Sequence, residues 1–211
     1  MSAMLTIKGY CMLRHALLLS TLVAMPSLAA AATQEERAAA SLPQQFLAHP
    51  LFQTSYSCSE HAWGELPYLG DDLGQDCVQQ EFVEEGGHAF MKSYRTDGLS
   101  NEDWFGWNRP VLSPCDCTVV RISLNATANA PGVLGSPPAS MIVLAAEDGT
   151  KVVLAHIQSP TVREGQQVKA GEAIARVGNN GYSRNPHIHI GAWREKQALQ
   201  IRWDQRHIPV L

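Results

Sequence analysis

The sequence has no cluster of lysine and arginine residues along its 211 positions, and it lacks internal repeats and low-complexity tracts. The chain carries 16 basic and 20 acidic residues, which gives a net charge of −4 at pH 7. A protein that binds nucleic acid or docks electrostatically on anionic lipid needs a concentrated positive surface. We therefore expect neither kind of partner.

A long apolar run that would make a good membrane span is also missing. The run ALLLSTLVAM at residues 16–25 is too short, and alanines and polar residues follow it too soon. Lys8 and Arg14 precede it and the small residues of PSLAAAA follow it, an order typical of a secretory signal peptide. We expect residues 1–32 to be this signal, with Met12 as an alternative start and a retained anchor as the alternative interpretation. The mature protein would then be periplasmic or secreted, with no stable membrane insertion.

The cysteines fit an exported protein. Removal of the signal takes Cys11 away and leaves Cys58, Cys77, Cys115 and Cys117, an even number that predicts disulfides with three alternative pairings. Cys115 and Cys117 flank one residue, and from an extended strand they would not readily bridge each other. We expect each of them to pair with Cys58 or Cys77. A metal site built from the CDC triplet and another thiol is the alternative.

About 180 residues remain after the signal, with 14 basic and 20 acidic residues and a net charge of −6. This length is enough for one domain with a real core. Residues 33–87 carry scattered aromatics, two cysteines and Gly/Asp turns, and we expect an irregular, disulfide-held N-terminal extension. Residues 88–211 are expected to form one β domain.

Short strands with glycine turns dominate the sequence from Val111 onward. Residues 117–124 form one expected strand, and residues 140–157 form a hairpin whose turn contains Asp148-Gly149. Further strands are expected within 161–178, 187–193 and 198–204, and residues 125–140 read as a loop. Little helix is expected, so the fold class is all-β, an antiparallel sandwich or barrel.

Three histidines stand at expected strand ends. His187 and His189 lie two positions apart, so their imidazoles point to the same face of a strand. They could be two polar surface residues, two metal ligands, or a ligand and a catalytic base. His156 ends a strand, where alternation places it on one face with Val152 and Leu154. Taken alone, it could be a histidine at the edge of the core.

The order of these motifs resembles the lysostaphin-like zinc endopeptidases, which cut peptide cross-links in bacterial cell walls. The matching segments are VLSPCDCTVV, VVLAHI, VREGQQVKAGEAIARVGNNG and PHIHIGAW, and the resemblance covers about residues 85–195. It implies a core of antiparallel β-sheets of the duplicated hybrid motif type.

The resemblance also implies roles for the histidines. It makes His189 a zinc ligand, and it makes His187 and His156 catalytic partners that do not bind the metal. The family's remaining ligands are a His and an Asp further upstream, usually with three residues between them. No such pair occurs before Val111, and the best match is His88 and Asp97, with eight residues between them.

Two other interpretations of this upstream segment stay open. Asp103 competes with Asp97 as the carboxylate ligand, and Asp97-Gly98 could be a plain turn with His88 on the surface. Two His and one carboxylate would leave a tetrahedral zinc one open position for water.

The expected function is therefore that of an exported zinc metalloendopeptidase. Its partners would be peptidoglycan peptides, with hydrolysis at cross-links or stem peptides. One alternative is a catalytically inactive relative that binds the cell wall or regulates another wall hydrolase. A protease that acts elsewhere, or a small-molecule hydrolase, is the third interpretation.

Overall fold

Strands make up nearly all regular structure in residues 42–209, the part of the chain that the structure, a computed structural model, describes. The expected signal at residues 1–32 lies outside the described residues. The strands are β1 (Gln45–Ala48), β2 (Tyr56–Glu60), β3 (Gln75–Gln79), β4 (Glu81–Glu85), β5 (His88–Lys92), β6 (Pro110–Leu112), β7 (Cys117–Ser123), β8 (Met141–Ala145), β9 (Lys151–Ala155), β10 (Ile157–Gln158), β11 (Gln167–Val168), β12 (Ala173–Val177), β13 (Ile188–Arg194) and β14 (Gln197–Trp203), with one short 3-10 helix, η1 (Asn101–Asp103). Within the described residues, no helix is long and apolar enough to cross a membrane. The expected all-β class is confirmed.

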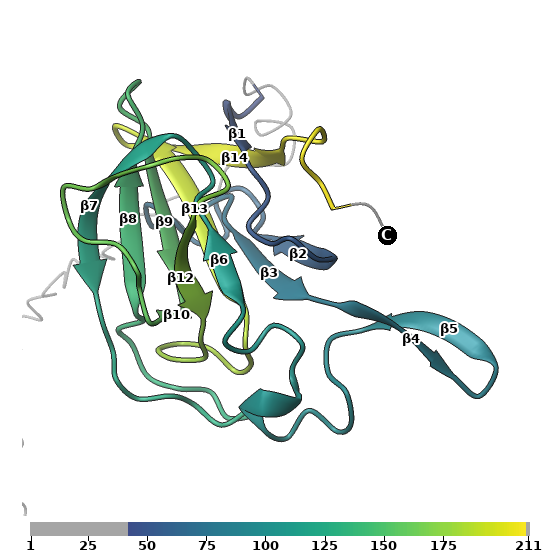
Figure 1. Cartoon of the computed structure of the whole chain (residues 1–211). Coiled ribbons are helices and arrows are strands. Elements are labelled where there is room, and N and C mark those ends of the chain that lie inside the picture. The colour runs from purple at the N-terminus through teal and green to yellow at the C-terminus, as the bar shows by residue number, and fades with distance from the viewer. Residues whose placement is uncertain (1–41, 210–211) are drawn as a thin grey trace, which may run out of the picture. The chain divides into compact units, whose positions relative to one another are not determined.

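The largest sheet has the strand order β1-β14-β13-β9-β8-β7-β11 (Figure 1). Its pairings are antiparallel except between β1 and β14. Strand β13 pairs with β9 along one edge, and its other edge is divided between β3 at residues 188–190 and β14 at residues 192–194. Strand β2 pairs in turn with β3. Because of this divided edge, residues near position 76 lie beside residue 189.

The expected hairpin at residues 140–157 is confirmed as β8 and β9. The two strands pair in register from Met141 opposite Ala155 to Ala145 opposite Lys151. The turn contains Asp148-Gly149, where Gly149 has a φ of 84° and the Asp148 carboxylate accepts the N–H of Thr150 at 3.0 Å. A positive φ at a turn is the conformation that glycine adopts without steric cost.

The core lies between the largest sheet and a three-stranded sheet of order β10-β12-β6. Each sheet turns alternate side chains inward, as the two-residue period of a strand requires. The fully buried members of this core from the two sheets include Val111, Val119, Ile142, Leu144, Val152, Leu154, Ile157, Ile174, Ile188 and Ile190. The inner face of β8, β9 and β13 packs in this core, and their outer face is free to line a surface groove.

The N-terminal extension is more regular than expected. Strands β1 and β3 join the largest sheet, so residues 45–48 and 75–79 share its hydrogen bonding. The β4–β5 hairpin is a separate two-stranded sheet that extends away from the other strands (Figure 1). Strands β1 and β3 are short and lack a clean apolar alternation. They pair with residues more than 100 positions away, so no local sequence pattern predicts them.

Two disulfides are present, but the expected cross-pairing is wrong. Cys58 bonds Cys77, its direct partner across β2 and β3, and Cys115 bonds Cys117. The expectation assumed that both residues of the CDC triplet lie in one extended strand. Cys115 instead lies in the bend before β7, where its Cα is 5.4 Å from that of Cys117, a separation that a disulfide spans. Within the described part of the expected extension, Cys58 and Cys77 form a disulfide with each other, as a disulfide-held segment requires.

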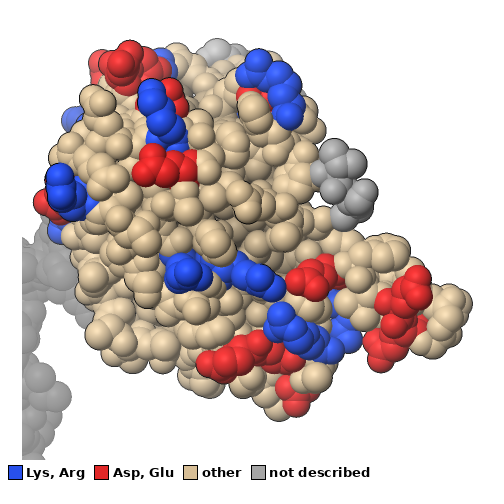
Figure 2. Space-filling model, in the orientation of Figure 1, with Lys and Arg blue, Asp and Glu red and all other residues tan. Residues whose placement is uncertain are grey.

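Charged side chains of both signs are interspersed over the face shown in Figure 2. Acidic groups gather towards the β4–β5 hairpin, whose first strand carries Glu81, Glu84 and Glu85. On this face the charge pattern offers no broad surface of one sign that would favour a highly charged polymer.

Candidate metal centre and active site

A groove of about 720 Å³ runs over the outer face of β8, β9 and β13. Its floor contains Met141 and Val143 from β8, Val153 and Ala155 from β9, and Trp193 from β13. The walls come from loop residues 66–71, 134–139 and 182–185. His61, Asp76, His156, His187 and His189 all line this groove. An apolar groove with a few convergent polar groups is the usual form of a binding site.

His61, Asp76 and His189 form a cluster in this groove whose ligand atoms all lie within 4.8 Å of one another. Asp76 lies on β3 opposite His189 on β13, and its Oδ1 is 2.9 Å from Nδ1 of His189. His61 follows β2, and its Nε2 is 3.4 Å from Oδ2 of Asp76. The pairing of β2 with β3 and of β3 with β13 thus brings three donor side chains together.

Backbone carbonyls determine which ring nitrogens face Asp76. Nε2 of His189 is 2.7 Å from the carbonyl oxygen of Gly70, and Nδ1 of His61 is 2.9 Å from that of Asp71. A carbonyl oxygen only accepts, so each of these nitrogens carries a hydrogen and donates it. The opposite nitrogens, Nδ1 of His189 and Nε2 of His61, then turn lone pairs towards the carboxylate.

Lone pairs that face a carboxylate repel it unless a proton or a metal cation lies between them. Two imidazoles and one carboxylate match the ligand preference of zinc, and a carbonyl partner on the far ring nitrogen is typical of metal-binding histidines. The residues present therefore fit a zinc ion.

Two further histidines lie beside the cluster. The rings of His156 and His187 are 4.6 Å apart between centroids, and Nε2 of His187 is 3.6 Å from Oδ1 of Asp76. Nδ1 of His156 donates to the carbonyl of Asn180 at 2.7 Å, and Nδ1 of His187 donates to that of Asn185 at 2.8 Å. Both rings therefore keep Nε2 free to accept a proton.

His156 ends β9 as expected, but its side chain does not share the face of Val152 and Leu154. Those two residues are fully buried in the core, whereas His156 lines the groove with Val153 and Ala155. The cause is the backbone of His156, whose φ of 62° interrupts the alternation of the strand. A non-glycine residue in this region is strained and is often found at functional sites.

Burial and mutual contact shift the pKa values of this group in different directions. Burial lowers the pKa of His156 to about 3, and the neighbouring charge of His187 lowers it further. Burial would raise the pKa of Asp76, but its contacts with His187 and His189 outweigh burial and hold that pKa well below its usual range. Burial would lower the pKa of His189, and its contact with Asp76 raises it by more. Asp76 is therefore ionised at neutral pH and His156 is uncharged.

The structure brings His156, His187 and His189 together and does not bring His88 and Asp97 to them. His88 is an exposed residue of the β4–β5 hairpin. Asp97 is exposed in a turn, where its Oδ1 accepts the N–H of Leu99 at 3.0 Å. The competing Asp103 accepts backbone N–H groups of Thr96 and Gly98. None of the three lines the groove, whereas His61 and Asp76 line it and lie beside His189.

A signal for His61 and Asp76 is present in the sequence beside the cysteines. His61 comes three residues after Cys58, and Asp76 comes one residue before Cys77. Pairing of these cysteines across two strands places Ser59 opposite Asp76 and brings His61 next to β3. The expected cross-pairing of Cys58 and Cys77 with the CDC triplet gave no reason to place His61 beside Asp76.

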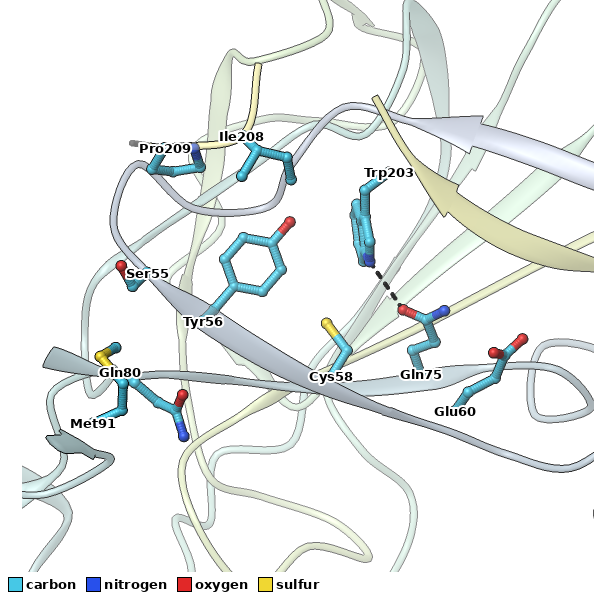
Figure 3. A pocket seen from close by; sticks show the side chains of 10 residues that line it. All are labelled: Ser55, Tyr56, Cys58, Glu60, Gln75, Gln80, Met91, Trp203, Ile208 and Pro209. Atoms are coloured by element: carbon cyan, nitrogen blue, oxygen red, sulfur yellow. Dashed lines mark hydrogen bonds between the residues drawn. The ribbon is translucent and has the colours of Figure 1, made fainter. Parts of the chain in front are cut away.

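A second cleft of about 550 Å³ lies elsewhere, between β2, β3 and the chain after β14 (Figure 3). Its rings, Tyr56 and Trp203, pack edge to face, and Nε1 of Trp203 donates to Oε1 of Gln75 at 3.1 Å. No residue of the histidine cluster lines this cleft. Gln75 and Asp76 are neighbours on β3 and point to opposite faces, so the cleft is separated from the histidines by the strand itself.

A site of two histidines and a carboxylate, with two more histidines able to accept protons, defines a class of metal-dependent hydrolases. Residues 105–201 match the model of a family described as peptidase family M23. This segment is thus similar to the peptidases of family M23. The matched residues include His156, His187 and His189 and begin after His61 and Asp76.

The chain is similar to several known proteins. A Haemophilus influenzae protein described as an uncharacterized metalloprotease is 35% identical over 80 residues, which are 38% of this chain and 15% of that protein. Among solved structures, the catalytic domain of the antimicrobial peptidase lysostaphin from Staphylococcus simulans is 18% identical, with a TM-score of 0.41, and the match covers 69% of this chain and 86% of that one. The M23 metalloprotease pseudoalterin, from the deep sea, is 14% identical with a TM-score of 0.43, and the match covers 73% of this chain and 74% of that one.

Proposed function

We propose that the protein is an exported zinc metallopeptidase that hydrolyses peptide bonds in peptidoglycan cross-links or stem peptides. The observation that carries the proposal is the convergence of Nε2 of His61, the Asp76 carboxylate and Nδ1 of His189 in one groove. These residues replace His88 and Asp97 as the proposed partners of His189. The peptidase family of residues 105–201 supports the reaction class.

Zinc held by these three residues supplies a Lewis acid, which polarises a carbonyl oxygen and makes water a better nucleophile at neutral pH. The carboxylate of Asp76 supplies the anionic oxygen of the ligand set. Its low pKa keeps it ionised throughout the neutral range. The carbonyls of Gly70 and Asp71 keep both imidazoles turned so that one nitrogen of each faces this carboxylate.

His187 and His156 are the proposed catalytic residues. When water attacks the scissile carbonyl carbon, its proton passes to Nε2 of one of these rings, and the proton then returns to the leaving amine nitrogen. The products are a free carboxylate and a free amine. A ring that holds the proton also donates a hydrogen bond to the developing oxyanion. The carbonyls of Asn180 and Asn185 keep both rings in the orientation that this requires.

The cell wall is proposed as the location of the substrate on two grounds. The sequence motifs resemble peptidases that cut wall cross-links, and the signal-like residues 1–32 would carry the protein to that compartment. N-terminal sequencing of protein recovered outside the cytoplasm tests the export directly. A new N-terminus close to residue 33 is expected, and a chain that keeps residues 1–32 in the cytoplasm would contradict it.

The test of activity compares His189→Ala with His187→Ala. The wild type should bind one zinc and release peptides from purified peptidoglycan, which mass spectrometry detects. His189→Ala should lose the zinc, because it removes a ligand. His187→Ala should keep the zinc and lose ~10²–10⁴-fold in rate, because it removes only a proton acceptor. Loss of zinc from both variants with the fold intact would show that His187 is also a ligand.

The inactive relative that binds or regulates is the second candidate. It would bind peptidoglycan in a sedimentation assay and release no peptide, with or without added zinc. The presence of His156, His187 and His189 in one groove favours the active enzyme, since hydrolysis needs proton acceptors beside the metal and binding alone does not.

A further inference from the structure

Two glycines meet where a loop crosses the largest sheet. Gly191 lies on β13, two residues after His189, and Gly70 lies in the loop between β2 and β3. A Cβ placed on Gly191 would overlap the carbonyl oxygen of Gly70 and would lie 2.7 Å from its Cα. The obstacle is main chain and not the end of a flexible side chain. No residue other than glycine fits at position 191 without moving the loop.

The loop is also fixed from its own side. Gly70 has a φ of 95°, and a Cβ there would lie 2.9 Å from Cγ1 of Val153 and 3.3 Å from the Trp193 ring. A Cβ on Gly74 would lie 2.8 Å from Cε1 of His189. The main chain of the loop therefore rests directly on the sheet and on the His189 ring. Such close approach is one of the recognised uses of glycine.

This contact fixes the two carbonyls that orient the imidazoles. The Gly70 carbonyl accepts from Nε2 of His189, and the carbonyl of the next residue, Asp71, accepts from Nδ1 of His61. One dipeptide thus sets both rings, and it sets them in opposite tautomers. Besides the Gly70 carbonyl at 2.7 Å, only the more distant Asp71 carboxylate, 3.5 Å from Nε2 and on the same loop, favours a hydrogen on that nitrogen.

We propose that Gly70 and Gly191 are positioning residues that select the metal-facing nitrogens, Nδ1 on His189 and Nε2 on His61. This inference rests on the metal site proposed above. The glycine contact acts through the two carbonyls and touches neither substrate nor metal. A methyl group at position 191 pushes the loop off the sheet, lengthens the His189 hydrogen bond and leaves that ring free to change tautomer.

The test compares Gly191→Ala with Gly106→Ala. A Cβ at Gly106 would meet Gln79 at an ordinary 3.4 Å, so this control adds the same methyl group without a clash. In a competition titration with a chelator, Gly191→Ala should bind zinc ~10–100-fold more weakly than wild type, as the loss of partners behind metal ligands does. Gly106→Ala should match wild type. A folded Gly191→Ala protein with wild-type zinc affinity would overturn the proposal.

Nitrogen NMR of zinc-free wild-type protein provides the second readout, which a merely structural glycine would not move. At alkaline pH, where the rings are neutral, His189 should carry its hydrogen on Nε2 and His61 on Nδ1. The Gly191→Ala variant should lose this preference at His189. If Gly191→Ala does not fold, the wild-type tautomers still decide, and the reverse assignment would reject the inference. A wild type that has these tautomers but binds no zinc would instead refute the proposed function.

Discussion

Replacement of Asp76 by asparagine is the most direct test of the revised ligand set. Asp76 is the one carboxylate in the cluster, with Oδ1 2.9 Å from His189 and Oδ2 3.4 Å from His61. Asparagine keeps the size of the side chain and removes its charge, so the change isolates the ionic contribution. The remaining donors would be two neutral imidazoles, which hold zinc poorly without an anionic partner.

The expected magnitude follows from this geometry. Loss of a group that only supports a metal ligand weakens binding by ~10–100-fold. Asp76 reaches both histidines itself, so Asp76→Asn should exceed that range and raise the zinc dissociation constant by more than ~100-fold. At about 1.4 kcal/mol for each factor of ten, this is a loss of more than about 2.8 kcal/mol in binding free energy.

The assay is a competition titration with a chromogenic zinc chelator at one fixed pH and ionic strength. Asp97→Asn is the matched control, because Asp97 is an exposed aspartate that accepts one N–H in a turn. It should stay within about twofold of wild type, as exposed substitutions usually do. A weaker Asp97→Asn together with an unchanged Asp76→Asn would refute the revised set and restore the ligands expected from the sequence. Unchanged affinity in both variants would place the zinc outside this cluster.

Two other predictions concern the disulfides and acid stability. The double variant Cys58→Ala/Cys77→Ala should weaken zinc binding and lower the free energy of unfolding by about 2–4 kcal/mol. The reason is that this disulfide joins β2, which His61 follows, to β3, which carries Asp76. The double variant Cys115→Ala/Cys117→Ala opens a disulfide between residues two positions apart and should leave zinc binding unchanged. Calorimetry measures the stability and a chelator titration measures the zinc affinity. An equal loss of zinc affinity in the two double variants would contradict the proposed ligands His61 and Asp76. His156 should make the zinc-free protein sensitive to acid: its pKa is lowered to about 3 when folded, so below about pH 6.5 the unfolded chain binds a proton that the folded chain does not, and stability should fall by about 1.4 kcal/mol per pH unit towards pH 3. His156→Asn, in which asparagine tolerates a positive φ, should flatten that slope in urea unfolding at several pH values, and an unchanged slope would contradict this role of His156.

The parts of the molecule with local sequence patterns could be predicted. The β8–β9 hairpin follows from two β-rich runs around Asp148-Gly149, and β13 follows from the alternation in HIHIGAW. His156, His187 and His189 gather because strands β9 and β13 pair directly, with His189 opposite Ala155. Neighbouring strands bring together residues that sequence reasoning already treats as strand ends.

The remaining proposed ligands could not be found by the same reasoning. His61 and Asp76 lie 15 positions apart and reach His189 through pairing of β3 with β13, at a separation of 113 residues from Asp76. No periodicity records such a pairing, because it is decided by the register of two short strands. His156 shows a second limit of sequence reasoning. Strand alternation predicts that its ring points into the core, but the positive φ of His156 itself turns the ring to the groove.

The divided edge of β13 has a consequence for when the site can exist. During synthesis His61 and Asp76 leave the ribosome long before His189, and β3 can pair only with β2, apart from the rest of the largest sheet, until β13 has been made. Contacts between residues so far apart in sequence form late, because the chain must first close a long loop. A nascent or truncated chain can therefore display two of the three donors without ever holding them in place. The proposed centre is therefore complete only once the last strands have formed, and a chain that stops short of residue 189 lacks one of its three donors.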